Sequence, residues 1–387
     1  MSNELEAAAL QALARTAISA PLVSHVYTAD PSAHVFDGAL YIYPSHDIDA
    51  GVAFSDDGSH FDMADYHVFR MAHPDAAVED LGQVLHVRDV PWAQRQMWAP
   101  DAAQRDGRTY LYFPAKRADG IFQIGVAVGD GPQGPFVAEP EPIAGTYSID
   151  PAIFADDDGA HYLYFGGIWG GQLQHYRDNV YAQTHQEPAD DAPALGPRVA
   201  RLREDMTQLA EPTREIVILD EHGAPLRAGD HARRFFEGPW VHHHAGRYYL
   251  SYSTGDTHLI CYATSDSPYG PFVYQGVLLD PVVGWTTHHS ICAFESQWYL
   301  FYHDAVLSGG QTHLRSIKMA PLEHTADGKI ARIYPYGETA VSPWTCWWSV
   351  AGWDVQEPVI CLLVTYTGTA RLGEPAHRLN VCVATGS

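Results

Sequence analysis

The sequence predicts an all-β protein, a five-bladed β-propeller with a short N-terminal helix and a C-terminal tail. The first observation is a phrase in which a turn residue is followed by alternating aromatic and aliphatic positions, typical of a half-buried strand after a tight turn. The phrase occurs five times, centred on Tyr41, Tyr110, Tyr162, Tyr249 and Tyr299. Repeated strand hairpins favour radial repetition, in which each blade is a small antiparallel sheet around a central channel. Five copies therefore predict five blades.

The second observation is that a polar or ionisable group precedes each of these tyrosines by roughly one strand and a turn. The five segments are Asp30-Pro31, Trp98 to Asp101, Asp150-Pro151, Glu237 to Pro239 and His288 to Ser290. The innermost strand of each propeller blade lines the central channel. We therefore expect Asp30, Asp150 and Glu237 to meet at one place, although they are far apart in the sequence.

The chain divides into three parts. Residues 1–20 are rich in Ala and Leu and predict one helix packed outside the main body. Residues 21–336 carry the five phrases and predict the propeller domain, with a Pro-, Asp- and Ala-rich irregular insertion at 186–199. Residues 337–387 contain no such phrase. For this tail, wrapping of the propeller, closure of its last blade and lack of order all stay open.

Composition narrows the class of protein. The formal net charge of −24 argues against nucleic acid as a partner, because phosphate binding needs a basic face. The five cysteines show no CxxC pair, and their odd number argues against a disulfide framework. No stretch is long and apolar enough to span a membrane, and the first twenty residues do not resemble a secretory signal. We therefore expect a cytoplasmic protein with no membrane partner.

Three carboxylates at the propeller axis are costly unless they are used or paired. Taken singly, an Asp-Pro pair at a strand start is often only a turn or cap residue, but recurrence at equivalent places favours a joint function. That function is glycoside hydrolysis, in which a carboxylic acid protonates the leaving oxygen and an ionised carboxylate activates water. Glu237 lies between aromatic residues and is the expected acid, Asp30 lies among polar neighbours and is the expected base. Asp150 is expected to keep the acid protonated by like-charge repulsion and to orient it.

These segments together resemble glycoside hydrolase family 43. The resemblance runs in order from about residue 21 to 336 and rests on YTADPS from Tyr27, MWAPD from Met97, SIDP from Ser148, FEGP from Phe236 and HHSI from His288. It implies a five-bladed propeller that cleaves xylosides and arabinosides with inversion. By the same resemblance Asp30 matches the general base, Glu237 the general acid and Asp150 the residue that tunes the acid.

Several further residues are expected to bind the sugar. Trp98 and Trp169 can stack on it, although a core position is as good an explanation for Trp98. Arg315 matches a family arginine that holds the sugar near the acids, and a structural ion pair would suit it equally. Asp47, which closes the first hairpin, and His288, where the family more often has glycine, complete the expected substrate-binding set.

One histidine is expected to bind a metal. His289 matches a family histidine in the central channel that often binds a divalent cation, commonly Ca²⁺. Imidazole is a modest ligand for a hard cation, so a single histidine with waters would form a loose site. The run His242 to His244 is not expected to bind one ion, because consecutive strand residues alternate faces.

The opening YTADPSA and the segment Arg95 to Trp98 most resemble the β-xylosidase branch of the family. The leading hypothesis is therefore an inverting exo-acting β-1,4-xylosidase that releases xylose from the non-reducing end of short xylo-oligosaccharides. The alternatives are an α-L-arabinofuranosidase, since the same acids serve both reactions, and a non-catalytic sugar-binding propeller. The sequence leaves homo-oligomer formation open.

Overall fold

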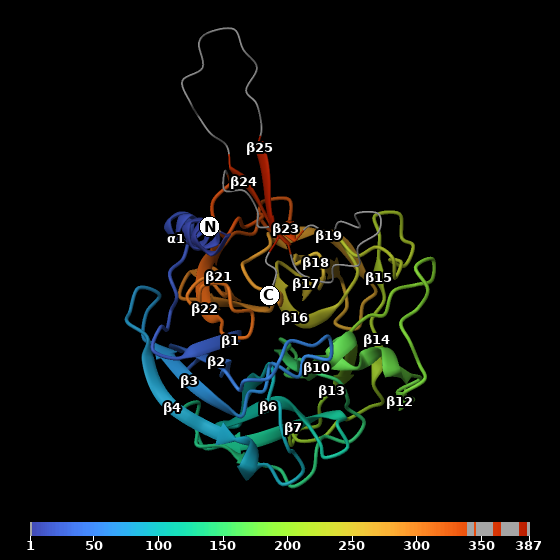
Figure 1. The fold of residues 1–387 in the computed structure, drawn as a ribbon. Coiled ribbons are helices and arrows are strands. Elements are labelled where there is room, and N and C mark those ends of the chain that lie inside the picture. The colour runs from blue at the N-terminus through green and yellow to red at the C-terminus, as the bar shows by residue number, and fades with distance from the viewer. Residues whose placement is uncertain (1, 339–343, 346–358, 365–378, 385–387) are drawn as a thin grey trace, which may run out of the picture.

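The computed structural model describes residues 2–338, 344–345, 359–364 and 379–384, and five antiparallel sheets surround a central axis (Figure 1). The sheets follow one another along the chain, and the innermost strand comes first in every blade except the fourth, where a short outer strand precedes it. These innermost strands contact one another in the ring order β1, β5, β9, β16 and β20, and β20 closes the ring against β1. The predicted five-bladed propeller is confirmed.

The first two blades are four-stranded meanders in sequence order. Blade 1 contains β1 (Tyr27–Phe36), β2 (Ala39–Asp47), β3 (Asp65–Met71) and β4 (Glu79–His86), followed by the short 3₁₀ helix η1 (Val87–Asp89). Blade 2 contains β5 (Asp101–Arg105), β6 (Arg108–Lys116), β7 (Phe122–Gly129) and β8 (Val137–Ala138).

The third blade carries the largest excursion from the repeat. Its sheet contains β9 (Ala152–Ala155), β10 (His161–Phe165), β13 (Arg198–Arg201) and β14 (Arg214–Glu215). Between β10 and β13 the chain forms η2 (Trp169–Gly171), η3 (Leu173–His175) and a hairpin of β11 (Tyr176–Arg177) and β12 (Val180–Tyr181). This excursion carries Trp169 to the pocket described below.

The last two blades complete the ring. Blade 4 contains β16 (Glu237–His244), β17 (Arg247–Ser253), β18 (Ile260–Ser265), β19 (Phe272–Leu279) and, parallel to β19 at its outer edge, β15 (Ile218–Leu219). Blade 5 contains β20 (His289–Phe294), β21 (Gln297–Asp304) and β22 (Ser316–Leu322).

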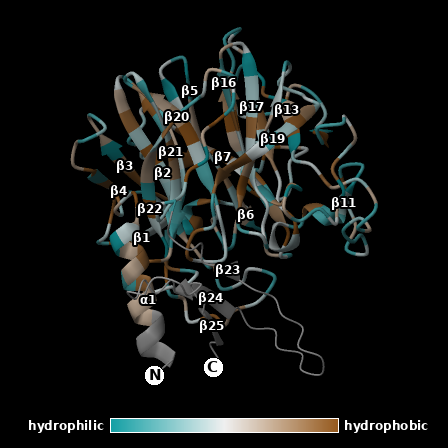
Figure 2. Ribbon diagram, turned by 90° about the horizontal axis from the view of Figure 1, so that it is seen from above, coloured by the Kyte–Doolittle hydropathy of each residue, from teal (hydrophilic) through white to brown (hydrophobic). Residues whose placement is uncertain are grey.

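The ends of the chain lie outside the blades. Helix α1 (Ser2–Thr16) buries Leu10 and Leu13 against Val283, Ala305 and Tyr336, as expected of a helix packed outside the main body (Figure 2). The described parts of the tail are β23 (Trp344–Thr345), β24 (Val359–Val364) and β25 (Leu379–Ala384), which pair with one another in a separate antiparallel sheet. The rest of the tail lies outside the described residues. Among the described residues, no helix combines the length and apolarity needed to cross a membrane.

The last tyrosine of the recurring phrase joins three of the blades to the blade that follows. In the first three blades the hydroxyl groups of Tyr43, Tyr112 and Tyr164 each donate to a backbone oxygen of the following blade at 2.7 Å, namely those of Pro132, Met206 and Pro268. All three tyrosines are buried. Each ring contributes apolar contact area while its hydroxyl satisfies a backbone acceptor, which explains why tyrosine recurs where phenylalanine would leave that acceptor unpaired.

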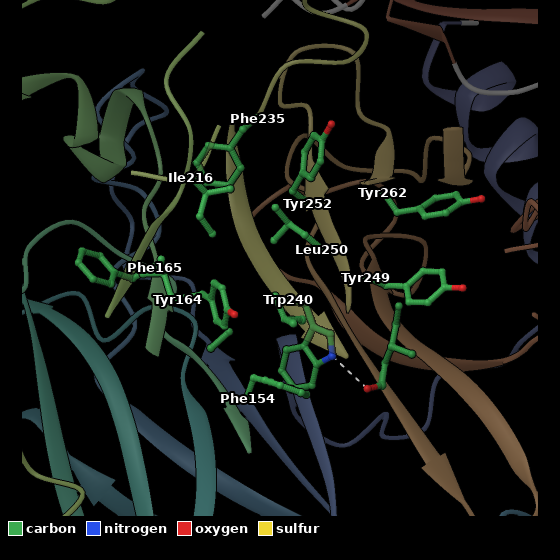
Figure 3. Packing of buried hydrophobic residues seen from close by; sticks show 14 of the residues in the cluster. Phe154, Tyr164, Phe165, Ile216, Phe235, Trp240, Tyr249, Leu250, Tyr252 and Tyr262 are labelled. Carbon is green, nitrogen blue, oxygen red and sulfur yellow. Dashed lines mark hydrogen bonds between the residues drawn. The ribbon is translucent and has the colours of Figure 1, made fainter. Parts of the chain in front are cut away.

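Blades 4 and 5 are joined in a related way. Nε1 of Trp240 donates to the backbone oxygen of Ile291 at 3.0 Å, and the indole packs among the aromatic side chains of blades 3 and 4 (Figure 3). The packing between blades holds the inner strands in fixed relative positions. The ends of these strands therefore form a rigid platform for the site.

Candidate active site

The three predicted acids lie at the same end of the ring and line one pocket. Asp30 belongs to β1, Asp150 lies two residues before β9, and Glu237 is the first residue of β16. The pairing of β1 with β2 shifts register between Ala29 and Ser32, and the pairing of β16 with β17 shifts between Glu237 and Trp240. A bulge of this kind redirects a side chain out of the regular pleat.

The backbone conformation at the acids also indicates a functional site. Asp30 has φ 51° and Asp150 has φ 57°, both in the left-handed region that non-glycine residues seldom adopt. Gly238, directly after Glu237, has φ 63°. Strained backbone is retained where the surroundings hold it, and it concentrates at functional sites.

Asp30 is held as an ionised carboxylate. Its oxygens accept hydrogen bonds from Arg315 Nη1 at 3.0 Å and from Ser45 Oγ at 2.6 Å. Burial by itself would raise the pKa of Asp30, but the positive charge of Arg315, with smaller contributions from His303, His288 and the Ser45 hydrogen bond, lowers this pKa to about 2. This carboxylate therefore stays charged at any pH at which the protein is expected to work.

His303 fixes the backbone of Asp30. The backbone N–H of Asp30 donates to Nδ1 of His303 at 3.0 Å, so the ring proton sits on Nε2, which lies 3.0 Å from the backbone oxygen of Thr286. Burial, followed by the charge of Arg315, lowers the pKa of His303 to about 3. The imidazole is therefore neutral and serves as a fixed acceptor beneath the carboxylate.

Glu237 and Asp150 have the opposite character. Burial, followed by the negative charge of Asp30, raises the pKa of Glu237 to about 8. Burial, followed by the charges of Glu237 and Asp30, raises the pKa of Asp150 well above its usual range. Oδ2 of Asp150 accepts the backbone N–H of Gly238 at 2.9 Å, which ties it to the residue that follows Glu237. Glu237 and Asp150 therefore stay protonated at neutral pH, next to the ionised carboxylate of Asp30.

Arg315 connects the base to the rest of the pocket. Its Nε and Nη2 donate to the two oxygens of Asp47, each at 2.8 Å, and its backbone N–H donates to Asp47 as well, at 2.8 Å. Its Nη1 also donates to Oγ1 of Thr286 at 2.9 Å, and the guanidinium carbon lies 4.9 Å from the ring centre of Phe61. Arg315 lines the pocket, but the predicted substrate-binding residue Asp47 is buried behind it and does not.

Aromatic side chains form the pocket walls. Trp169 packs edge-on against Phe236 with ring centres 5.2 Å apart and lies 5.7 Å from Trp285. On another wall, Nε1 of Trp98 donates to the backbone oxygen of Phe61 at 2.7 Å. The structure therefore places both predicted stacking tryptophans, Trp98 and Trp169, in the pocket lining.

The two adjacent histidines diverge. His288 lines the pocket, and its Nε2 lies 3.9 Å from Oδ2 of Asp150. His289 is fully buried and does not line the pocket; its Nε2 lies 2.6 Å from Oγ of Ser251, and its Nδ1 has no hydrogen-bond partner among the residues that the structure describes. Burial lowers the pKa of His289 well below its usual range, so the ring is neutral and can act as a ligand.

These donors provide a limited test of the predicted calcium site. Ca²⁺ takes six to eight oxygen ligands and prefers carboxylates and carbonyls. His289 offers one imidazole nitrogen, with one hydroxyl beside it, and its ring contacts no described carboxylate. This donor set fits a cation held mainly by water with one protein ligand, and it does not fit a site built from protein oxygens.

Several site residues were not predicted from the sequence. They are Ser45, Phe61, Trp285, Thr286 and His303. The hairpin pattern could have indicated two of them, Ser45 and His303, because the second strand of a hairpin ends opposite the start of the first strand, where the acids lie. Ser45 pairs with Ala29, next to Asp30, and His303 directly follows the last tyrosine of the fifth phrase. Phe61 and Trp285 lie in connections outside the named strands and carried no such signal.

Comparison with known proteins adds three findings. The family model described as "Glycosyl hydrolases family 43" matches residues 23–330. The chain is 58% identical over 325 residues to "Xylosidase/arabinosidase 43A" of Humicola insolens, covering 82% of this chain and 99% of that one. It is also similar to the crystal structure of the GH43_1 enzyme of Xanthomonas citri complexed with xylose, with 87% identity, a TM-score of 0.85, and coverage of 87% and 99% of the two chains.

A further solved structure bears on the metal. The β-xylosidase/α-arabinofuranosidase CoXyl43 from a compost microbial metagenome was solved with xylotriose and is described as the calcium-free form. It is 61% identical to this chain with a TM-score of 0.82, and the match covers 83% of this chain and 98% of that one.

Proposed function

Since the chain belongs to glycoside hydrolase family 43, we propose that it is an inverting exo-β-1,4-xylosidase that releases xylose from the non-reducing end of short xylo-oligosaccharides. One observation carries the proposal. A carboxylate whose pKa is about 2 and a carboxyl group whose pKa is about 8 line the same pocket, as an acid–base pair for glycoside cleavage requires. Support for the substrate comes from the related enzyme of Xanthomonas citri, whose structures contain xylose or xylotriose.

Glu237 is the proposed general acid. With a pKa of about 8 it carries its proton at neutral pH and can donate it to the glycosidic oxygen as the bond to the leaving sugar breaks. Burial creates this property, and the ionised Asp30 reinforces it. After the leaving group departs, the same burial and the negative charge of Asp30 would favour protonation of Glu237 by solvent.

Asp30 is the proposed general base. It accepts a proton from the water that attacks the anomeric carbon on the face opposite to the leaving group. Arg315 and Ser45 hold its two oxygens, and His303 holds its backbone. A base of such low pKa is a weak proton acceptor, so its contribution lies in orienting the water and in stabilising the positive charge that develops on the sugar ring.

Asp150 is proposed to position the acid. Because Asp150 keeps its own proton, the like-charge repulsion expected from it comes instead from the ionised Asp30. It contacts the backbone N–H of Gly238, adjacent to Glu237, and shares the buried environment of that residue. Asp47 acts one step further away, because it bonds to Arg315 without lining the pocket. Trp98, Trp169 and Trp285 offer ring faces to the apolar faces of the sugar, and His288 lies beside Asp150.

The second candidate activity is that of an α-L-arabinofuranosidase. It is favoured by the names of related proteins, since three of them are called xylosidase/arabinosidase. The same acid and base would serve this reaction, and the pocket walls would decide between the sugars. A non-catalytic sugar-binding role is not retained, because the chain is a glycoside hydrolase of this family.

Rates on nitrophenyl β-D-xyloside and nitrophenyl α-L-arabinofuranoside, measured side by side, test the substrate. A preference for the xyloside supports the proposal, and a preference for the arabinoside replaces it with the second candidate. The anomer released first, followed by NMR, tests the stereochemistry. Initial release of α-xylose is expected, and initial release of β-xylose would refute inversion.

The proposed cation is Ca²⁺ held by His289 and water. Support comes from Nδ1 of this buried ring, which has no hydrogen-bond partner in the described part of the chain, and from the relative described as calcium-free. When bound to His289, such a cation would supply positive charge at the start of β20. The proton transfers proposed above use only Glu237 and Asp30.

A further inference from the structure

We propose that blade 1 carries a second metal site, separate from the active site, in which His46, Asp65 and His67 bind a divalent transition-metal ion, with Zn²⁺ as the best match. Among the residues that the structure describes, these three form the one group of histidine, cysteine or acidic side chains whose ligand atoms all lie within 4.8 Å of one another. The inference does not depend on the proposed substrate.

Strand register explains why these side chains meet. Ser45 of β2 pairs with Tyr66 of β3, so the residues next to them, His46 and Asp65, face each other across the two strands. His67 lies two residues beyond Asp65 and therefore points to the same face of the sheet. Ring centres of His46 and His67 are 4.9 Å apart.

The side of β2 opposite to His46 points toward the active site. Ser45 contacts Asp30 there, and Asp47 contacts Arg315. Since side chains alternate along a strand, His46 points away from these residues. The candidate metal site therefore shares a strand with the active site without sharing any ligand with it.

The chemistry of the donors suits a borderline metal ion. Two imidazoles and one carboxylate form a ligand set found in zinc sites, in which a water completes the tetrahedron. With metal–ligand bonds of about 2.0–2.2 Å, ligand atoms in a tetrahedral site are roughly 3.3 Å apart. Nδ1 of His46 is 2.6 Å from Oδ1 of Asp65, a distance set by the proton between them. A metal ion would replace that proton and move the two groups apart by less than 1 Å.

Neighbouring groups favour the site. Oδ1 of Asp80 lies 3.4 Å from Nδ1 of His67, which leaves Nε2 of His67 available to a metal. Oδ2 of Asp80 lies 2.7 Å from Nε2 of His25. A carboxylate behind a histidine ligand orients the ring and raises its basicity. The side chains of His46, Asp65 and His67 are only 21%, 15% and 16% exposed, so the ligands are partly ordered by packing while a metal can still reach them.

The alternative is that His46, Asp65, His67 and Asp80 form only a network of hydrogen bonds on the sheet surface. In that case Asp65 serves as the hydrogen-bond partner that raises the pKa of His46. Calorimetric titration with Zn²⁺ distinguishes the two. The full chain is first freed of metal by dialysis against a chelator and then titrated beside two variants, His67→Gln and Asp65→Asn, each of which removes one ligand.

The matched control is His222→Ala. The side chain of His222 is 82% exposed, and its Nε2 lies 3.8 Å from a carboxylate oxygen of Glu221, so this residue reports on incidental binding by surface histidines. The wild type and this control are expected to bind one more zinc ion than the two ligand variants, or to bind it at least about 100-fold more tightly. Zn²⁺ is also expected to raise the melting temperature of the wild type more than that of His67→Gln.

Three results would overturn the proposal: no zinc binding by the metal-free wild type, equal binding by wild type and His67→Gln, or a loss of binding in His222→Ala as large as in the ligand variants. Equal xyloside hydrolysis by wild type and His67→Gln without added metal is expected, because His67 does not line the active-site pocket. This measurement separates a failure of the metal site from a failure of the proposed enzyme function.

Discussion

Replacing Glu237 with Gln removes the proposed acid while keeping its shape, and the structure sets the size of the effect. With a pKa of about 8, the carboxyl group is about 99% protonated at pH 6 and about 9% protonated at pH 9. Wild-type kcat on xylobiose, measured by xylose release, is therefore expected to be flat to about pH 7 and to fall roughly tenfold by pH 9. Glu237→Gln should lose about 10²–10⁴-fold at pH 6 and show no alkaline limb.

The choice of leaving group makes the test specific. A nitrophenyl group departs with little help from an acid, so the loss on nitrophenyl xyloside should be much smaller than the loss on xylobiose. Equal losses on both substrates, equal activity of variant and wild type, or an alkaline limb that survives the substitution would refute the assignment of Glu237.

Stability provides an independent check on the same residue. The folded-state pKa of Glu237 is raised from 4.5 to about 8, so the wild type loses stability as pH rises from 4.5 through 8. Glu237→Gln has no such charge to bury and should melt at a higher temperature than wild type at pH 8, with a smaller difference at pH 5. A variant that melts lower at both pH values would show that the side chain is structural.

Three further predictions concern the surroundings of the acids. Arg315→Met should move the acid limb of kcat/KM upward by about two pH units or more, because the pKa of Asp30 then rises from about 2 to 3.8 or above. Arg315→Lys keeps the positive charge and should leave this limb below pH 4. Equal acid limbs in both variants would contradict the role of the charge. Trp169→Phe should retain most activity, whereas Trp169→Ala should raise KM on xylotriose by about tenfold, because the stacking face is lost. An unchanged KM in Trp169→Ala would show that Trp169 does not bind the sugar. Chelation should lower wild-type activity reversibly and leave His289→Gln unaffected, and a similar response in both would exclude His289 as the ligand.

The propeller itself was predictable because its physical cause is local. A turn followed by alternating aromatic and aliphatic residues forms a strand wherever it occurs, and five copies of one hairpin imply a repeating architecture. The acids Asp30, Asp150 and Glu237 were predictable for the same reason, since they precede three of these copies at equivalent positions. The structure brings all three to one pocket.

Other features depended on contacts between distant segments. No pattern in the sequence indicated that Asp47 lies behind Arg315, 268 residues away, or that His303 lies beneath Asp30, 273 residues away. Nor did it predict that Phe61 and Trp285, from connections between strands, complete the walls. Loop conformation follows from what the loop packs against, and residue pattern carries little information about it.

The sequence by itself determined the number of blades, the hairpin with which each acid is associated and the chemical class of the reaction. The sequence assigned the acid and the base, but only the tertiary structure shows what keeps one carboxyl group ionised, because a pKa depends on burial and on charges contributed by other blades. Asp30 and Glu237 both begin as buried acids in similar hairpins. Arg315 from blade 5 lies against Asp30, and so one acid becomes a charged base while the other keeps its proton.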